Sequence, residues 1–407
     1  MSKSPVAVAD TGSRVSRWSI FLAYLRLGCS SFGGPIAHLG YFHDEFVVRR
    51  KWVEEATFTD IVGLCQFLPG PASSQVGFTI GLLRGGIWGA LAAWTAFTLP
   101  SALLMFAVAS GHGLFSSSVG SGVVHALQLV AVAVIAQAVW TMMQTLTPDR
   151  TRATIAVIAA AVILLLGRAT SQLVALALGG VLGLVFYRNA AAESSGQLRI
   201  PISRSVAVAA LLVFVLLFVG PSLFLAARYS HPVAFFEAFY RSGALVFGGG
   251  HVVLPLLQTA TVSTRWTDNH TFLAGYGAAQ ALPGPLFTFA AYLGAVVEPQ
   301  PHGALGAAIA LAAIFLPGLL LVIGVLPFWN QLRSNDRSRA LLAGVNASVV
   351  GILLSALYRP VWTSTILNPA DFLMALVAFI ALTVWKAPPW MVVVASAAGG
   401  ILWSFFP

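Results

Sequence analysis

The chain contains one unit twice, and this duplication restricts its fold more than any other feature of the sequence. Phe-Gly-Gly, a Trp and Pro-Gly-Pro follow one another in the same order in both halves. The copies are 215 positions apart at first, then 214 and finally 217. The matched residues are Arg26 with Arg241, Gly28 with Gly243, Phe32-Gly33-Gly34 with Phe247-Gly248-Gly249, Trp52 with Trp266, Pro69-Gly70-Pro71 with Pro283-Gly284-Pro285, Gly86 with Gly303, and Pro100 with Pro317. Matches in a fixed order over this length indicate a duplicated structural unit.

The composition places this unit in a membrane. Hydrophobic residues make up 58% of the chain and charged residues 9%, with a mean hydropathy of +0.86, whereas about a quarter of a soluble domain is charged. Apolar stretches of about 20 residues, the length that crosses a bilayer core, recur along most of the chain. Lipid offers no partner for backbone groups outside a helix or a closed barrel, and the alternation typical of barrel strands is absent. The sequence therefore predicts an all-α polytopic membrane protein.

Several other classes are disfavoured. Cys29 and Cys65 lie in apolar surroundings without CxxC spacing, so neither a disulfide framework nor a metal site is indicated. The net charge of +9 is attributed to cytoplasmic loops of a membrane protein rather than to nucleic-acid binding. No nucleotide-binding loop or nucleophile–base motif appears, which counts against an enzyme and against a cofactor.

About 13 spanning segments are predicted, as two repeats of six around one extra segment. They are 18–40, 58–84, 86–110, 119–146, 151–168, 170–188, 205–227, 232–254, 270–297, 303–327, 338–358, 370–386 and 389–406. Pro-Gly-Pro interrupts two of them, 58–84 and 270–297, and proline removes a backbone donor and clashes with the preceding turn. Both are therefore predicted to be broken helices.

The loop charges predict that the two repeats have inverted topology. Basic residues in the loops 147–152, 188–204 and 328–340 place these loops in the cytoplasm, and loop 111–118, which carries no Lys or Arg, is external. The predicted units are a cytoplasmic tail 1–17, a first repeat 18–188, a linker with one extra helix 189–231, and a second, inverted repeat 232–407. This count places the N-terminus inside and the C-terminus outside.

One basic patch conflicts with this count. Arg49, Arg50 and Lys51 would lie outside, although basic residues favour the cytoplasmic side. A re-entrant segment 58–84 would move the patch inside but would place the N-terminus outside. A single crossing is retained, because the same choice in the second half agrees with the loop charges there.

Arg26 and Arg241 are the first candidate substrate ligands. Each lies near the middle of an apolar segment, where a charge costs about 2.5–3.5 kcal/mol on insertion scales unless it faces a polar cavity or a partner. Inverted repeats bring their equivalent elements together near the midplane, and a forked guanidinium matches an oxyanion. The sequence therefore predicts a joint clamp on a tetrahedral anion. The alternative is a structural arginine paired with an internal acid, and Glu237 precedes Arg241 by four residues.

The glycine and proline elements are the second candidates. A helix broken at proline exposes N–H groups whose dipole favours an anion, and glycine permits close approach. Duplicated Gly pairs and Pro-Gly-Pro breaks indicate discontinuous helices at equivalent positions; tight helix packing is the alternative. The predicted substrate-binding residues besides the arginines are Gly33, Gly34, Gly248, Gly249, Ser73 and Ser74, and the predicted structural breaks are Pro69, Gly70, Pro71, Pro283, Gly284 and Pro285.

Four ionisable residues lack a counterpart in the other half. They are His38, Glu45, Asp60 and His251. Asymmetric ionisable groups in a symmetric frame are candidates for proton coupling. A helix cap is the alternative for Asp60, and interfacial hydrogen bonding is the alternative for His38.

These motifs together resemble the chromate ion transporter family in its long-chain, two-domain form, from about Ser19 to the C-terminus. The residues that carry the resemblance in the first half are Arg26, Phe32, Gly33, Gly34, Pro35, His38, Glu45, Arg49, Trp52, Asp60, Pro69, Gly70 and Pro71. The resemblance implies export of chromate from the bacterial cytoplasm across the plasma (inner) membrane, driven by the proton motive force and giving chromate resistance. The implied partners are chromate, protons and the lipid bilayer, with sulfate as a competitor. A homodimer is compatible with the resemblance. The second half lacks counterparts of His38, Glu45 and Asp60, so the halves need not contribute equally.

Other readings stay open at this point. Chromate and sulfate are both tetrahedral dianions, so a transporter for sulfate or another oxyanion fits the same residues. An anion channel fits them as well, because no motif distinguishes a channel from a carrier.

Overall fold

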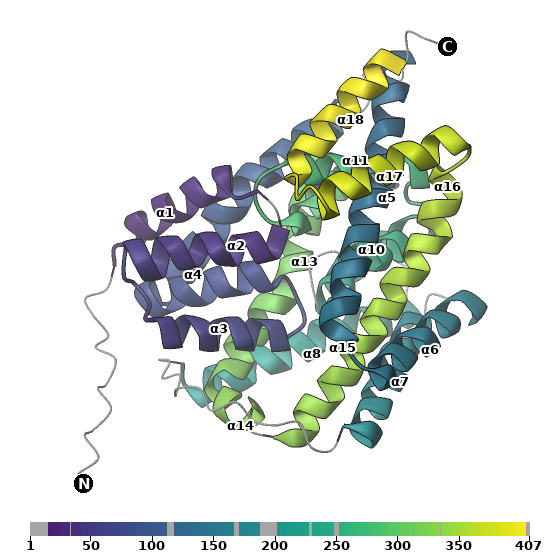
Figure 1. Cartoon of the computed structure of the whole chain (residues 1–407). Helices are drawn as coiled ribbons and strands as arrows, with labels where there is room; N and C mark the ends of the chain where they lie inside the picture. Colours follow the sequence, from purple (N-terminus) through teal and green to yellow (C-terminus); the bar gives the residue numbers. More distant parts are fainter. Residues whose placement is uncertain are drawn as a thin grey trace.

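The computed structural model describes residues 15–32, 34–111, 118–166, 171–187, 202–227, 230–247, 252–333 and 335–403. Every regular element in these ranges is helical, which confirms the predicted all-α class (Figure 1). Five helices are long and apolar enough to cross a membrane, namely 72–110, 122–146, 204–224, 303–328 and 336–365. Shorter apolar helices accompany them. The chain is thus a multi-pass membrane protein.

The elements follow the duplication. Those of the first half are α1 (Arg17–Ser30), α2 (Gly34–Phe42), the π-helix η1 (His43–Arg49), α3 (Glu55–Phe67), α4 (Ala72–Ser110), α5 (Ser118–Leu146), α6 (Arg150–Leu166) and α7 (Ser171–Phe186). The extra helix is α8 (Arg204–Ala227). Those of the second half are α9 (His231–Ala244), α10 (Val253–Thr261), α11 (Asn269–Ala281), η4 (Leu286–Thr288), α12 (Phe289–Val296), α13 (Gly303–Val325), η5 (Leu326–Phe328), α14 (Trp329–Arg333), α15 (Asp336–Ala356), η6 (Leu357–Trp362), α16 (Thr363–Thr365), α17 (Pro369–Thr383) and α18 (Pro389–Trp403).

The helix breaks lie where the Gly and Pro motifs predict them. Pro-Gly-Pro separates α3 from α4 and α11 from η4, with positive φ at Gly70 (124°) and Gly284 (94°). The chain also reverses inside α4 at Gly86 (φ 64°) and at the first residue of α13, the matched Gly303 (φ 61°). These backbone angles are readily adopted only by glycine. The segment 18–40 is interrupted as well, because α1 ends at Ser30 and α2 begins at Gly34, so it is not the continuous span drawn from hydropathy.

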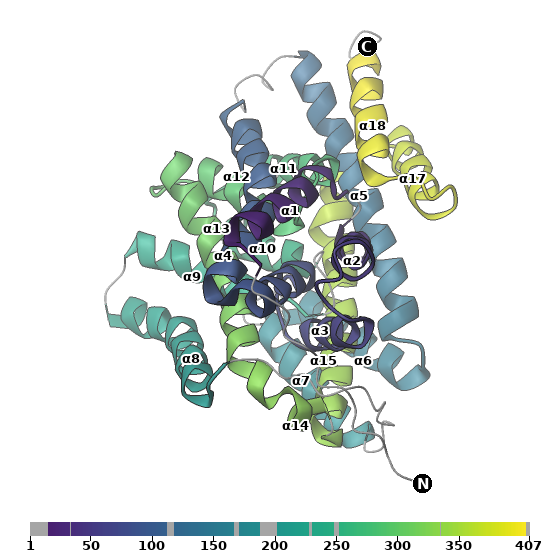
Figure 2. The same ribbon diagram turned by 90° about the vertical axis from the view of Figure 1, so that its left-hand side faces the viewer.

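In the first half, the broken segments fold back on themselves as hairpins. The Val15 N–H donates to the Arg84 carbonyl oxygen (3.1 Å), and the Tyr24 hydroxyl donates to the Gly77 carbonyl oxygen (2.9 Å), so α1 runs antiparallel to the first part of α4. The Tyr24 ring lies 4.7 Å from that of Phe46, so η1 returns toward the start of α1. The helices α1, α2 and α3 each pack on α4, and their outer ends lie at one edge of the molecule (Figures 1 and 2).

The two halves interlock at the tips of these hairpins. The Gly70 N–H donates to the Val246 carbonyl oxygen (2.7 Å), and the Gly284 N–H donates to the Ser31 carbonyl oxygen (2.8 Å). Ser31 and Val246 are themselves 215 positions apart, so each Pro-Gly-Pro glycine makes the same bond to the opposite half. The last helices are exchanged in the same way, since α6 and α7 pack on α15 while α17 and α18 pack on α5.

The turns that precede the matched tryptophans also repeat. The Trp52 N–H donates to the Phe46 carbonyl oxygen (2.7 Å), and the Trp266 N–H donates to the Thr261 carbonyl oxygen (2.9 Å). The basic residue before each tryptophan, Lys51 or Arg265, has φ of 51° or 61°. The duplication found in the sequence is therefore a duplication of backbone geometry.

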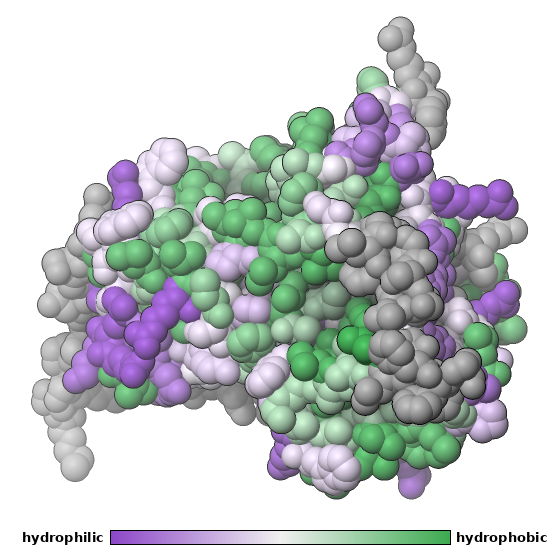
Figure 3. All heavy atoms as spheres, turned by 90° about the horizontal axis from the view of Figure 1, so that it is seen from above, coloured by the Kyte–Doolittle hydropathy of each residue, from purple (hydrophilic) through white to green (hydrophobic). Residues whose placement is uncertain are grey.

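The extra helix α8 lies at the edge of the molecule and packs on α9 and α13 (Figure 2). Only 11% of its most apolar window is buried, which is typical of a helix that faces lipid. Figure 3 shows broad apolar surface over much of one face. Hydrophilic residues gather at its left-hand end, where Figure 1 places the outer ends of α1 to α3.

Candidate functional site

Arg26 lies at an open pocket of the first half. It is exposed on α1, and the pocket has a volume of about 440 Å³. The lining residues are Arg26, Leu27, Ser30, Tyr41, Asp44, Glu45, Val48 and Arg49. Two basic and two acidic side chains therefore surround a space large enough for a tetrahedral dianion. In the described part of the chain, no ion pair of Arg26 is seen.

Glu45 is held ionised at this pocket. Its side chain is buried, with the Arg50 Nε 2.6 Å from one carboxylate oxygen and the Arg49 Nη1 3.4 Å from the other. Burial raises the pKa of Glu45, but the hydrogen bonds and charges of Arg50 and Arg49 outweigh it and keep this pKa below its usual value. The predicted role of Glu45 in proton coupling is untested, and at neutral pH its carboxylate balances the basic patch.

Arg241 has a different neighbourhood from its counterpart Arg26. Its Nη1 lies 2.8 Å from the Glu237 carboxylate and donates to the Ser222 Oγ (3.1 Å) on α8, and its guanidinium lies over the Phe218 ring. The Ser222 hydroxyl also donates to the same Glu237 oxygen. Arg241 does not line the pocket of Arg26. This geometry matches the alternative that Arg241 pairs with an internal acid. A joint clamp of Arg26 and Arg241 on one anion remains a prediction.

His38 connects the two Pro-Gly-Pro elements. It is buried, with Nε2 3.2 Å from the Ser31 carbonyl oxygen and Nδ1 3.3 Å from the Ser73 Oγ. Because a carbonyl oxygen only accepts, Nε2 is the donor, and Nδ1 of a neutral imidazole accepts from Ser73. The same Ser31 carbonyl accepts the Gly284 N–H from the other half. His38 therefore joins the end of α1, the start of α4 and the second Pro-Gly-Pro.

Buried oxygens near this junction lack hydrogen-bond partners among the described residues. They are the Ser31 Oγ, the Ser74 Oγ and the Gln75 Oε1. The Gln75 amide group donates to the Pro69 and Gly318 carbonyl oxygens (3.0 Å each), so it joins the first break to α13. Buried polar atoms of this kind are usually satisfied by water or a ligand.

The remaining predicted residues are placed as follows. Asp60 is buried as the sixth residue of α3, whose N-cap is Glu54, so the helix-cap alternative for Asp60 is wrong. Gly34 opens α2 with φ of 76°. The predicted substrate ligands Gly33, Gly248 and Gly249 and the predicted coupling residue His251 lie outside the described residues.

Sequence reasoning missed two polar contacts of this region. The Ser101 and Thr288 hydroxyls lie 2.6 Å apart across the interface between the halves, and the Ser222 hydroxyl bridges Glu237 and Arg241. Ser101 directly follows Pro100, and the duplication of this proline could have indicated that Ser101 lies near the interface between the halves. Ser222 lies on the helix without a counterpart, so the duplication offered no signal.

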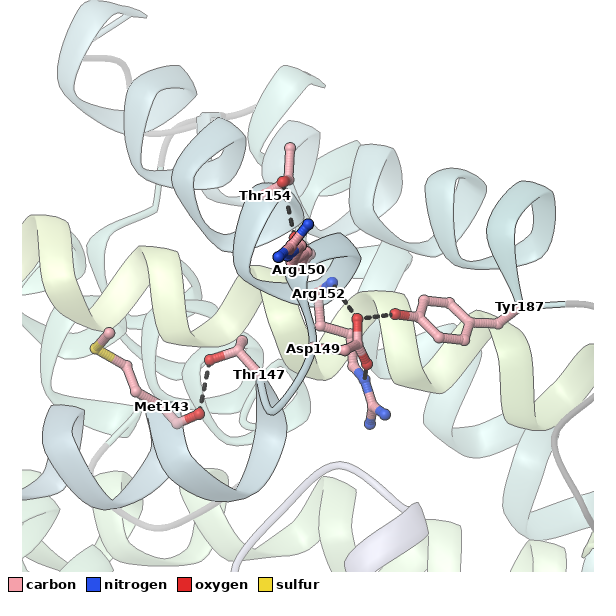
Figure 4. Close-up of polar contacts among 7 residues, drawn as sticks. All are labelled: Met143, Thr147, Asp149, Arg150, Arg152, Thr154 and Tyr187. Atoms are coloured by element: carbon pink, nitrogen blue, oxygen red, sulfur yellow. Dashed lines mark hydrogen bonds and ion pairs between the residues drawn. The ribbon is translucent and has the colours of Figure 1, made fainter.

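A separate polar cluster fixes the loop between α5 and α6 (Figure 4). Asp149 accepts from the Arg152 Nε (2.6 Å), the Arg152 N–H (2.9 Å) and the Tyr187 hydroxyl (2.5 Å). Burial raises the pKa of Asp149, but these donors and the Arg152 charge outweigh it and lower this pKa to about 2. The cluster joins the start of α6 to the end of α7, away from the residues predicted to bind substrate.

Comparison with known proteins identifies the family. The family described as chromate transporter matches residues 18–184 and again residues 233–401. The chain belongs to the chromate transporter family. The two matches correspond to the two halves of the internal duplication.

Relatives agree over nearly the whole length. A chromate transport protein from Pseudomonas aeruginosa is 28% identical over 95% of this chain and 92% of its own length. A probable chromate transport protein from Synechococcus elongatus is 27% identical over 94% of each chain. The uncharacterized transporter YwrB of Bacillus subtilis is 32% identical over 40% of this chain and 83% of its own length, about the length of one unit. No solved structure matches this chain.

Proposed function

We propose that this protein is a secondary active transporter that exports chromate from the bacterial cytoplasm, driven by the proton motive force. Membership of the chromate transporter family and full-length relatives named chromate transport protein support the substrate. The open pocket of Arg26, beside interlocked broken helices, is the structural observation that carries the proposal. Broken helices at the interface between repeats are typical of substrate sites in secondary transporters.

The hairpins suggest a membrane topology that differs from thirteen crossings. The Tyr24 ring packs on the Phe46 ring, so α1 and η1 fold back on each other, and the Glu298 N–H donates to the Trp266 carbonyl oxygen (2.9 Å), so α11 and α12 form another hairpin. We therefore propose that α1–α2, the hairpin of α3 with the start of α4, α9–α10 and α11–α12 are re-entrant. Nine helices then cross the membrane, and they are α4 from residue 87, α5, α6, α7, α8, α13, α15, α17 and α18.

This topology removes the conflict at the basic patch. With two re-entrant hairpins in the first half, the N-terminus and residues 49–51 lie on the same, cytoplasmic side. The loops 147–152, 188–204 and 328–340 stay inside, and loop 111–118 stays outside. The second-half hairpins then enter from the external side, so the halves remain inverted.

In this arrangement the two arginines serve in sequence. Arg26 precedes Ser31 by five residues and Arg241 precedes Val246 by five, which is about 7.5 Å along each helix from the interlock. Because the halves are inverted, Arg26 lies on the cytoplasmic side of the interlock and Arg241 on the external side. Chromate would bind at Arg26 first, pass the start of α4 with Ser73 and Ser74, and then meet Arg241; Gly33, Gly34, Gly248 and Gly249 stay predicted ligands.

His38, at the interlock, is the proposed proton-coupling residue, and Asp60 and His251 are the other candidates. A protonated imidazole donates from both ring nitrogens, so the Ser73 hydroxyl would have to change from donor to acceptor. This change acts at the contact between the halves, where alternating access requires movement. Glu45 serves in this scheme as the counter-charge of the basic patch.

Transport into inverted membrane vesicles tests the proposal. A proton gradient, acid inside, is expected to drive labelled chromate into the vesicles above its external concentration. Unlabelled sulfate in excess is expected to compete only weakly. Equilibration without accumulation would indicate a channel, and equal competition by sulfate would indicate a general oxyanion transporter.

A further inference from the structure

We infer that the Glu237 carboxylate is an internal ligand of Arg241 that the transported oxyanion has to displace. Glu237 thereby sets the affinity of the second half for its substrate. The inference rests on the proposed oxyanion transport and adds a residue with a defined role to it.

The contacts around Arg241 resemble those of a bound oxyanion. One Glu237 oxygen accepts from the Arg241 Nη1 (2.8 Å) and from the Ser222 hydroxyl, and Ser222 accepts from Arg241 as well (3.1 Å). A guanidinium and a hydroxyl are donors that also suit an oxygen of chromate or sulfate. Glu237 is buried and Arg241 is only a third exposed, so water weakens this pair less than it weakens a surface pair.

The first half shows what the same position looks like without an internal carboxylate. Leu22 is the counterpart of Glu237, 215 positions earlier and four residues before Arg26. Its side chain is 46% exposed, and Arg26 lines an open pocket. The helix that carries Ser222 and Phe218 has no counterpart in the first half. Arg26 is therefore open to a ligand, whereas its counterpart Arg241 is already paired with Glu237.

An occupied arginine lowers the apparent affinity for an external anion. A ligand that binds only molecules with a released Arg241 binds more weakly, in proportion to the fraction of released molecules. In an exporter, weak binding at Arg241 favours release of the anion to the outside, whereas the open Arg26 favours its capture from the cytoplasm. The asymmetry thus suits Arg26 to capture and Arg241 to release, while the proton gradient sets the direction of net transport.

The test compares oxyanion binding by two matched variants of the full-length purified protein. Glu237→Gln keeps the size of the side chain and removes the charge, so chromate and sulfate are expected to bind roughly tenfold more tightly or better. Leu22→Glu places the same carboxylate four residues before Arg26, so binding is expected to weaken by a similar factor.

Further variants separate displacement from a general effect of charge. Asp336→Asn removes a carboxylate from another arginine pair, at the start of α15, and is expected to leave binding unchanged. Glu237→Gln is expected to tighten binding in the wild-type background but not in an Arg241→Gln background, because the gain requires the released guanidinium. A gain that persists without Arg241 would overturn the inference.

The outcomes also separate this inference from the proposed function. If the wild type binds chromate and a stably folded Glu237→Gln variant binds no better, displacement is wrong and oxyanion transport stands. If neither protein binds any oxyanion, both are wrong. If Glu237→Gln unfolds, a folded Leu22→Glu variant that binds no more weakly than the wild type still refutes displacement.

Discussion

The two halves of this transporter share a backbone frame but differ in what surrounds the same arginine. Arg26 lines an open pocket, whereas Arg241 is bound by Glu237 and by Ser222 of the extra helix. The glycine-directed hydrogen bonds between the halves are nearly identical, at 2.7 and 2.8 Å. The comparison indicates that the two halves keep one backbone scaffold while the side chains around the matched arginines differ.

The arginines are expected to give the largest difference between the halves. Arg26→Lys keeps the charge but loses the forked donors, and charged hydrogen bonds contribute about 1.5–3 kcal/mol each, so binding should weaken roughly tenfold to a hundredfold. Arg241→Lys should weaken equilibrium binding much less, because Glu237 already occupies that arginine. Chromate titration of the purified variants measures both losses. A double variant that loses less than the sum of the two would restore the joint clamp.

Asp60 is the next way to probe the asymmetry, because its counterpart is Ala274. Asp60→Asn is expected to flatten the pH dependence of chromate transport more than it weakens chromate binding, since an amide cannot carry the proton. Uptake into vesicles at several pH values, beside binding to the purified variant, measures this. An unchanged pH profile would assign Asp60 to packing alone.

The hydroxyl pair across the interface should have a smaller effect. Thr288 donates to the Pro285 carbonyl oxygen (2.8 Å), so it accepts from Ser101. Ser101→Ala removes that one hydrogen bond and is expected to cost about 1 kcal/mol of stability. Gln75→Leu, in the first half, removes two and should cost about twice as much. Thermal unfolding in detergent measures the stability of both variants. Equal losses of stability would contradict the prediction that the hydrogen bonds of Gln75 contribute more than the one from Ser101.

The Asp149 cluster should have the smallest effect and lies outside the compared sites. Its folded pKa of about 2 is below the usual value of about 3.9. Its contribution to stability is therefore complete above about pH 4 and is lost as the pH falls toward 2. The group is partly exposed, so the contribution is on the order of 0.2–1 kcal/mol. The difference in melting temperature between wild type and Asp149→Asn should shrink over this range; a constant difference would contradict the ion pair.

Much of the fold could be predicted from the sequence because its signals are local. Apolar length predicted helices such as α5 and α15, and Pro-Gly-Pro and the Gly pairs predicted the breaks. The folding of the broken helices into hairpins could not be read from hydropathy, since a hairpin and a single crossing have the same apolar length. The misplaced basic patch at residues 49–51 was the one local sign of it.

The candidate sites were less predictable than the fold. The duplication pointed to Arg26 and Arg241, but whether each is open or occupied depends on side chains that the duplication does not share. Glu237 was visible four residues before Arg241, whereas Ser222 contacts Arg241 only because α8 packs on α9. Side chains that differ between the halves require the packed structure to place them.

Labelling of two matched positions tests the central claim, that the halves are inverted around re-entrant hairpins, most directly. Lys51→Cys and Arg265→Cys place one thiol in equivalent turns, each next to its duplicated tryptophan, in a chain whose Cys29 and Cys65 have been replaced. A membrane-impermeant thiol reagent applied to intact cells is expected to label Arg265→Cys only, and Lys51→Cys is expected to be labelled only in inverted vesicles. Labelling of both positions from the same side would contradict the account.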